Sequence, residues 1–153
     1  MLKDYQLCQC LFGEHLLINQ PNKPVGIVES EKTAIIASAY LPELTWMAAG
    51  SLNGINVQLL SSLSGKSIVL YPDIKGYEKW ERKAHELKAQ GFKIAVSDIL
   101  EKADFVTEED RTKGYDLADY LPLLPVSDTD LQRLIKRNPS IELLVRRFDL
   151  TVL

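Results

Sequence analysis

Residues 25–49, VGIVESEKTAIIASAYLPELTWMAA, contain two short apolar runs separated by one helical stretch. Val25 to Glu29 is apolar at successive positions, which is typical of a strand that is buried on both faces. Ser30 to Tyr40 carries alanine and isoleucine at closely spaced positions and predicts a helix that ends before Pro42. Leu44 to Ala49 predicts a second strand. This order of strand, helix and strand is that of a parallel β-α-β unit.

The same alternation continues beyond this unit. Ser67 to Tyr71 and Phe92 to Val96 predict two further strands, and Tyr77 to Gln90 predicts the helix between them. An apolar stripe at helical spacing defines the buried side of that helix, formed by Tyr77, Trp80, Ala84 and Leu87. The fold class that follows is α/β, with a mainly parallel sheet of about four strands and flanking helices.

Three weaker patterns complete the coarse prediction. Leu7 to Ile18 is apolar enough for a hairpin or an edge strand that packs on the core, and Ile55 to Leu63 predicts a short helix. The segments around Asp128 to Lys136 and Ser140 to Phe148 predict a small C-terminal helical appendage, with Asp128 as a helix N-cap. We therefore expect a lead-in segment over 1–24, a core over 25–121 and a helical extension over 122–153.

Composition excludes several classes of protein. The chain has 153 residues, of which 46% are hydrophobic and 25% charged, so one domain with at most an appendage is expected. A net charge of −3 excludes nucleic-acid binding by bulk positive charge. Cys8 and Cys10 are too few for a disulfide scaffold or a zinc site, which indicates a reduced chain. No apolar run reaches the ~18 residues of a membrane span, so we expect a cytoplasmic protein without a membrane partner.

Two acidic residues follow predicted strands. Glu29 ends the first strand, and Asp73 comes after the third strand, directly behind Pro72. Ligands of open parallel sheets bind at the carboxyl ends of the strands. If the two strands are neighbours, both carboxylates can share one hard cation, Mg²⁺ or Mn²⁺. Asp73 could instead only close a turn.

A third acidic group lies later in the chain. Asp116 and Asp119 are three positions apart and would share one face at the start of a short helix. Asp116 could also serve only as the N-cap of that helix. The loop Gly50 to Gly54 follows the second strand, and its backbone N–H groups could hold a phosphate or simply form a turn.

Three stretches together resemble the signature of a Toprim domain, the catalytic module of bacterial primases, topoisomerases and some nucleases. They are VGIVESEKTAIIAS (25–38), IVLYPDIKG (68–76) and KGYDLADYL (113–121). CLFGEHLL (10–17) is similar to the stretch that leads into the Toprim core of primases. The nearest resemblance is to Toprim-like primase proteins of phages and mobile elements, which implies a Rossmann-like, Toprim-like core.

The resemblance implies roles for the acidic residues. Glu29 matches the glutamate of the family, a group near the metal that acts as general base or acid, and Asp73 matches the first aspartate of its Asp-x-Asp pair. The resemblance therefore implies that Glu29 and Asp73 are catalytic. It also implies that a Mg²⁺ or Mn²⁺ ion is bound by four acidic side chains, those of Glu29, Asp73, Asp116 and Asp119.

Lys75 departs from the family pattern, because it replaces the second aspartate of Asp-x-Asp. A lysine ammonium cannot ligate Mg²⁺ but can donate hydrogen bonds to a phosphate. Lys75 therefore indicates either phosphate contact or a degenerate site. Lys32, one turn into the first helix, is a second candidate phosphate ligand, although a solvated lysine is the simpler interpretation.

The resemblance implies a domain of a primase-related replication or mobilisation protein that carries out metal-dependent phosphoryl or nucleotidyl transfer. Its partners would be DNA or nucleotides and a further catalytic or helicase domain, in the same or a partner chain. Two alternatives remain. One is a degenerate Toprim module that binds DNA or a protein without catalysis, and the other is a nuclease that uses a single metal.

Overall fold

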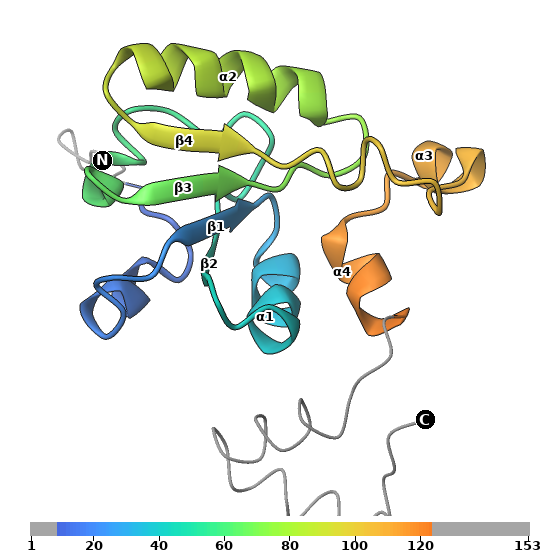
Figure 1. Cartoon of the computed structure of the whole chain (residues 1–153), viewed down its shortest axis with the longest axis horizontal. Coiled ribbons are helices and arrows are strands. Elements are labelled where there is room, and N and C mark those ends of the chain that lie inside the picture. The colour runs from blue at the N-terminus through green and yellow to red at the C-terminus, as the bar shows by residue number, and fades with distance from the viewer. Residues whose placement is uncertain (1–8, 124–153) are drawn as a thin grey trace, which may run out of the picture.

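A four-stranded, all-parallel sheet forms the centre of the molecule (Figure 1). The structure is a computed structural model and describes residues 9–123. The strand order is β2-β1-β3-β4. The strands are β1 (Val25–Val28), β2 (Thr45–Ala48), β3 (Ser67–Leu70) and β4 (Lys93–Val96). The predicted α/β class with a parallel sheet is confirmed.

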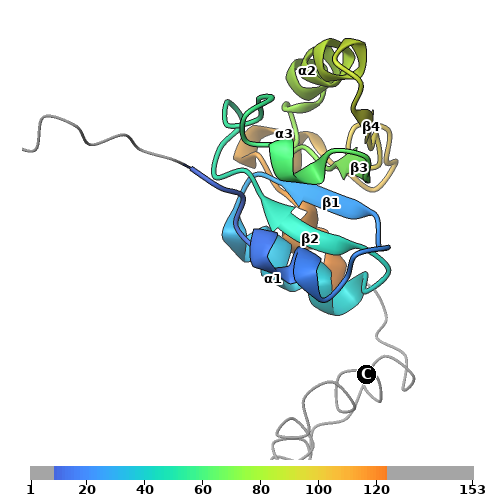
Figure 2. The same cartoon turned by 90° about the vertical axis from the view of Figure 1, so that its left-hand side faces the viewer.

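Helices cover both faces of this sheet (Figures 1 and 2). Figure 1 shows α2 on one side and both α1 and α4 on the other, with α3 beyond the ends of the strands. The α-helices are α1 (Glu31–Tyr40), α2 (Tyr77–Ala89), α3 (Glu108–Lys113) and α4 (Leu117–Tyr120). The short 3-10 helices are η1 (Glu14–Ile18), η2 (Ser61–Leu63) and η3 (Leu121–Leu123).

The core has two parts, one on each face of the sheet. On the α2 side, Trp80, Ala84 and Leu87 pack against strand residues such as Ile27, which confirms the predicted stripe for these three helix positions. On the α1 side the cluster combines residues of the strands, α1, α4, η3 and two loops: Val28, Ala34, Ala37, Trp46, Ala48, Ile74, Leu100, Leu117 and Leu121. Burial of all four β1 residues explains why that strand is apolar throughout.

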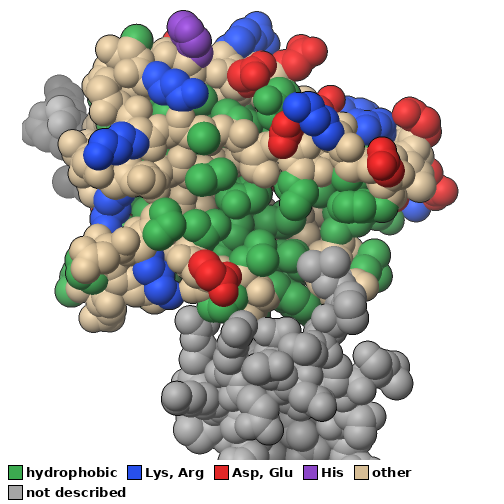
Figure 3. Space-filling view, viewed as in Figure 1, with side chains coloured by type: hydrophobic (Ala, Val, Ile, Leu, Met, Phe, Trp, Pro, Cys, Tyr) green, Lys and Arg blue, Asp and Glu red, His purple; other side chains and the backbone are tan. Residues whose placement is uncertain are grey.

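Charged and hydrophobic side chains separate on the surface (Figure 3). In this view many of the charged side chains lie over α2 and α3, while hydrophobic side chains fill the middle of the face. The exposed side of α2 is polar because its apolar residues are gathered on the face that meets the sheet.

The segment ahead of β1 differs from the prediction. It forms neither a hairpin nor a regular strand over residues 9–18, but one antiparallel bridge between Phe12 and Ala48, followed by η1. Phe12 N donates to Ala48 O at 3.0 Å, and Ala48 N donates to Phe12 O at 3.2 Å. Gly13 then turns the chain away with φ 81°, a conformation that suits glycine and ends the pairing.

The helix predicted over 55–63 is reduced to turns and the short η2. Asn56 caps the first of these turns, because its side-chain oxygen accepts a hydrogen bond from Leu59 N at 2.9 Å. The predicted helices at Asp128 to Lys136 and Ser140 to Phe148 lie outside the described residues.

None of the described helices is both long enough and apolar enough to span a membrane.

Gly26 allows β1 and β2 to pack side by side. A Cβ at this position would lie 2.8 Å from ring carbons of Trp46. The indole cannot easily move, because its Nε1 donates to Leu41 O at 2.8 Å and its ring packs on Tyr71 with centroids 4.9 Å apart. Gly26 is therefore required by the close approach of the aromatic ring.

We expect Gly26→Ala to lower the free energy of unfolding by about 1–3 kcal/mol, the usual cost of overpacking a core. Urea denaturation measures this change. Ser67→Ala, at the exposed start of β3, is the control and should change stability little. Equal stability of the Gly26→Ala variant and the wild type would contradict the assigned contact.

Candidate functional site

The candidate site lies where β1 and β3 end. β1 continues into α1 on one face of the sheet and β3 continues into α2 on the other, so the two chain segments diverge here. This divergence is the switch point at which open parallel sheets bind ligands. β1 and β3 are neighbours, and Tyr71 N donates to Ile27 O at 2.8 Å just beyond the last paired residues. The two strands that precede Glu29 and Asp73 are therefore neighbours, as a shared cation would require.

Glu29 is half-buried directly behind β1. Burial raises the pKa of its carboxyl group, while hydrogen bonds from the backbone N–H groups of Asp73 and Leu52 and the positive charge of Lys79 act in the opposite direction. The carboxylate is thus held between the segments that follow β2 and β3. Leu52 belongs to the loop from Gly50 to Gly54, so part of that loop faces the carboxylate.

Asp73 is a half-buried carboxyl group whose pKa is strongly raised. Burial, followed by the negative charges of Glu29 and Asp116, raises its pKa to about 7, and the positive charge of Lys32 opposes this only in part. Its own backbone closes a turn, since Gly76 N donates to Asp73 O at 2.8 Å. Asp73 therefore both forms the turn and presents a half-buried carboxylate to the site.

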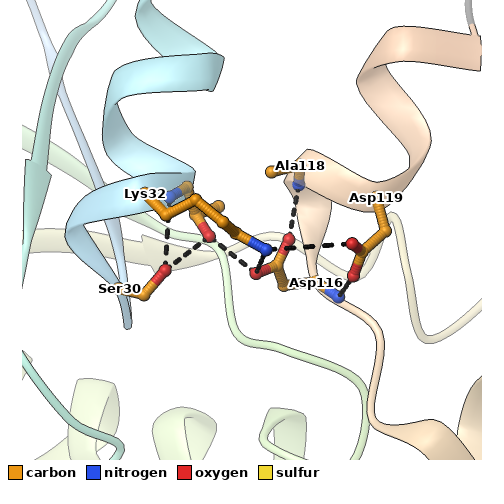
Figure 4. A network of polar contacts seen from close by, with 6 residues as sticks. Ser30, Lys32, Asp116, Ala118 and Asp119 are labelled. Carbon is orange, nitrogen blue, oxygen red and sulfur yellow. Dashed lines mark hydrogen bonds and ion pairs between the residues drawn. The ribbon is translucent and has the colours of Figure 1, made fainter.

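Asp116 is the N-cap of α4, and both oxygens of its carboxylate are engaged (Figure 4). One oxygen accepts from Ala118 N at 2.7 Å. The other accepts from the Thr33 hydroxyl at 2.7 Å and lies 3.1 Å from Lys32 Nζ. The side chain is buried, so these contacts satisfy a charge that would otherwise be costly in the interior.

Asp119 completes the capping of α4. Its carboxylate accepts a hydrogen bond from Asp116 N at 2.8 Å, and its second oxygen lies 3.8 Å from Lys32 Nζ. The two aspartates form a capping box at the start of α4. The Asp116 side chain accepts from the backbone of the first turn, and the Asp119 side chain accepts from the backbone N–H of Asp116. Asp116 is therefore an N-cap, and it also binds Thr33 and Lys32.

Lys32 is not a merely solvated lysine. It extends from the first turn of α1 to both aspartates of α4, as Figure 4 shows, and its hydrogen bond to Asp116 raises its pKa. Its side chain remains 59% exposed, so the ammonium can also meet solvent or a ligand.

Ser30 and Thr33 extend the network to the start of α1. Thr33 N donates to Ser30 Oγ at 3.2 Å, which caps the helix, and the two hydroxyls lie 2.8 Å apart. Because the Thr33 hydroxyl gives its hydrogen to Asp116, the Ser30 hydroxyl must donate to Thr33. A continuous chain of hydrogen bonds thus joins the end of β1 to α4.

Lys75 lies apart from these charges. Its side chain is exposed, and its backbone has φ 74°, the one positive φ at a residue other than glycine within residues 9–123. It occupies the third position of the turn from Asp73 to Gly76, where a type II turn requires positive φ. The charges that act on Asp73 come from Lys32 and the acidic residues instead.

The four predicted metal ligands thus divide into two pairs. Glu29 and Asp73 lie together at the switch point, whereas Asp116 and Asp119 are occupied by α4 and Lys32. Within residues 9–123, no three His, Cys, Asp or Glu side chains are grouped as a metal site would require.

Sequence reasoning missed three participants. Thr33 is buried and bonds Asp116, the Leu52 N–H faces Glu29, and Lys79 acts on Glu29 from α2. The spacing of Ser30 and Thr33 at the start of a helix marks the cap, but the partner 83 positions away along the chain becomes visible only in the folded structure.

We expect Thr33→Val to lower the free energy of unfolding by about 1–3 kcal/mol, because the buried Asp116 carboxylate loses one of its three partners and the Ser30 hydroxyl loses the acceptor of its hydrogen. Thermal and urea denaturation measure the change. Thr112→Val is a matched control, since the Thr112 hydroxyl bonds Glu108 O on an exposed helix. A loss no larger than that of the control would show that the network does not stabilise the fold.

We expect Asp73→Asn to stabilise the protein at about pH 8 by about 1–2 kcal/mol, a value reduced for solvent screening. The folded state keeps a proton on Asp73 up to a pKa of about 7, whereas the unfolded state loses it near the ordinary value of 3.8. Wild-type stability therefore falls between these two pH values, and the amide removes this fall.

Denaturation of both proteins across this pH range in the presence of a chelator measures the effect. Asp104→Asn, at an exposed aspartate, is the control and should follow the wild type. A constant difference between Asp73→Asn and the wild type at every pH would contradict the raised pKa.

Comparison with known families gives one match. The model of a family described as Domain of unknown function (DUF6371) matches residues 1–74. This range includes β1, α1, β2 and β3 with Glu29 and Asp73, but not Asp116. The comparisons with curated proteins and with solved structures gave no match.

Proposed function

We propose that the chain is a Toprim-like module of a primase-related protein that takes part in metal-dependent phosphoryl or nucleotidyl transfer on nucleic acid. The observation that carries the proposal is the pairing of Glu29 and Asp73 at the β1/β3 switch point. Both carboxyl groups are half-buried, and the negative charge of Glu29 helps to raise the pKa of Asp73, so a divalent cation would be stabilised between them.

The residues present fit Mg²⁺ or Mn²⁺ in a particular way. Both side chains offer oxygen donors, which hard cations prefer. The raised pKa of Asp73 reflects its burial first and then the negative charges of Glu29 and Asp116, which the positive charge of Lys32 opposes only in part. Mg²⁺ is often held by only one or two carboxylates, with water and substrate phosphates completing its shell. A pair formed by Glu29 and Asp73 is consistent with that arrangement.

Under this proposal the chain's own residues have separate tasks. Glu29 and Asp73 hold the cation, which would neutralise charge on a reacting phosphate. Glu29, which is kept in place by the N–H groups of Leu52 and Asp73, is also the candidate general base or acid. Asp116 and Asp119 act as positioning residues, because they fix Lys32 at the edge of the site. The Lys32 ammonium then remains available to a phosphate.

A second candidate function is a degenerate Toprim module that binds DNA or a protein without catalysis. Lys75 favours it, since it stands where the family has a second metal-binding aspartate. The contacts of Asp116 favour it too, because three partners already occupy that carboxylate.

A nuclease that uses a single metal at Glu29 and Asp73 would need the same pair as the main proposal, so cleavage of DNA by the chain would favour that reaction.

Calorimetric titration with Mg²⁺ and Mn²⁺ tests the main proposal. We expect saturable binding by the wild type and a loss of at least about tenfold in affinity in Glu29→Gln and Asp73→Asn, because each substitution removes one anionic ligand. Glu31→Gln is the control, since Glu31 is exposed and only two positions away from Glu29.

Absence of metal binding by a folded wild type would reject the main proposal. DNA binding that is insensitive to a chelator and falls steeply with salt would then support the degenerate module.

The variants Lys75→Asp and Lys75→Asn test the effect of Lys75 directly. Aspartate and asparagine both tolerate the positive φ of this position, and only aspartate adds a carboxylate. Stronger metal binding by Lys75→Asp alone would show that Lys75 limits the site.

A further inference from the structure

A groove of about 350 Å³ runs between α2 and the loop that follows β2. Leu52 and Asn53 form one wall, and one face of α2 forms the other. Its side chains from α2, at helical spacing, are Lys79, Arg82, Lys83 and Glu86. Three of these four side chains are basic, in a chain whose net charge is −3.

Two of the three cations, Lys79 and Arg82, lie outside the ion pairs formed within residues 9–123. Lys83 pairs with Glu86 at 2.9 Å, but neither Lys79 nor Arg82 forms an ion pair with a residue in the part of the chain that the structure describes. Arg82 Nε makes one long hydrogen bond of 3.4 Å to Glu78 O on its own helix, which leaves its other guanidinium N–H groups unused. The groove therefore has a surplus of positive charge.

The two walls are fixed to each other. Trp80 Nε1 donates to Leu52 O at 3.0 Å, and Trp80 is fully buried in the core. Gly76 lies so close to the loop that a Cβ there would be 3.1 Å from a Leu52 methyl carbon. The groove is thus a built feature of the fold, not a gap between independent side chains.

Leu52 also connects the groove to the carboxylate pair. Its carbonyl bonds Trp80 on the groove side, while its N–H bonds the Glu29 carboxylate. Lys79 lines the groove, and its positive charge also acts to lower the pKa of Glu29. A polyanion that lies in the groove would extend from Arg82 past Lys79 toward Glu29.

We propose that this groove, defined by Leu52, Asn53, Lys79, Arg82 and Lys83, binds phosphate groups of the substrate and directs the next phosphate toward Glu29 and Asp73. This inference extends the proposed function. The part that concerns the reacting phosphate rests on that function, because it requires the metal site at Glu29 and Asp73. The ligand chemistry is a chain of phosphates, which either a nucleic-acid backbone or a nucleoside triphosphate supplies. Lysine and arginine are the usual partners of both.

Fluorescence anisotropy with two probes tests the proposal, and a chelator is present throughout so that the metal site does not contribute. The probes are a labelled single-stranded oligonucleotide and a labelled nucleoside triphosphate. We expect Lys79→Gln/Arg82→Gln to weaken the wild-type binding by about 5–20-fold at low salt. For the oligonucleotide, the slope of log affinity against log salt should decrease by about 2, one for each lost cation.

The matched control is Lys88→Gln/Lys93→Gln, which removes the same charge from exposed lysines outside the groove. A loss for the oligonucleotide alone identifies a nucleic-acid backbone as the source of the phosphates, and a loss for the triphosphate identifies a nucleotide. An equal loss in the control pair, or no binding of either probe by the wild type, would overturn the proposal.

Titration of the wild type with Mg²⁺ alone, beside the probe experiment in the chelator, separates this inference from the proposed function. Metal binding without groove binding rejects the groove alone. Groove binding without metal binding rejects phosphoryl transfer and leaves a phosphate-binding module.

Discussion

The parallel pairing of β1 with β3 is the constraint on which the rest of the structure depends. It places a strand that leads to α1 beside a strand that leads to α2, and the two helices cover opposite faces of the sheet. Where their paths diverge, backbone N–H groups and carboxylates from separate segments meet at Glu29 and Asp73. The chemistry proposed here follows from that divergence.

The hydrogen-bond network around Asp116 has a structural task beside this site. It holds α4 against the first turn of α1 through Thr33 and Lys32, although α4 is only four residues long. So short a helix has little stability of its own. A buried carboxylate with three partners supplies the missing stability, and it also fixes a lysine within electrostatic range of Asp73.

The sheet could be predicted because its information is local. The four strands and the two main helices follow from apolar runs and from the spacing of residues such as Trp80 and Leu87. The sequence predicted that Glu29 and Asp73 lie close together only if β1 and β3 are neighbours. It could not show that they are, since strand order is set by how the helices pack on the two faces.

The remaining features depend on contacts between distant segments. Nothing near Thr33 in the sequence indicates Asp116, the residue to which its hydroxyl donates in the folded structure. Periodicity also could not show that the segment ahead of β1 pairs through one bridge, because pairing of a single residue leaves no repeating pattern.

That single bridge determines how the sheet meets other chains. β2 and β4 are the edge strands of the described sheet, and an open edge offers backbone groups to any passing strand. Phe12 covers part of the β2 edge, while exposed Lys93 lies at the start of the β4 edge, where a charge discourages pairing. A fragment that begins at Val25 would lose the first protection together with Leu11, which is buried in the core. Aggregation through β2 is the expected consequence of that truncation.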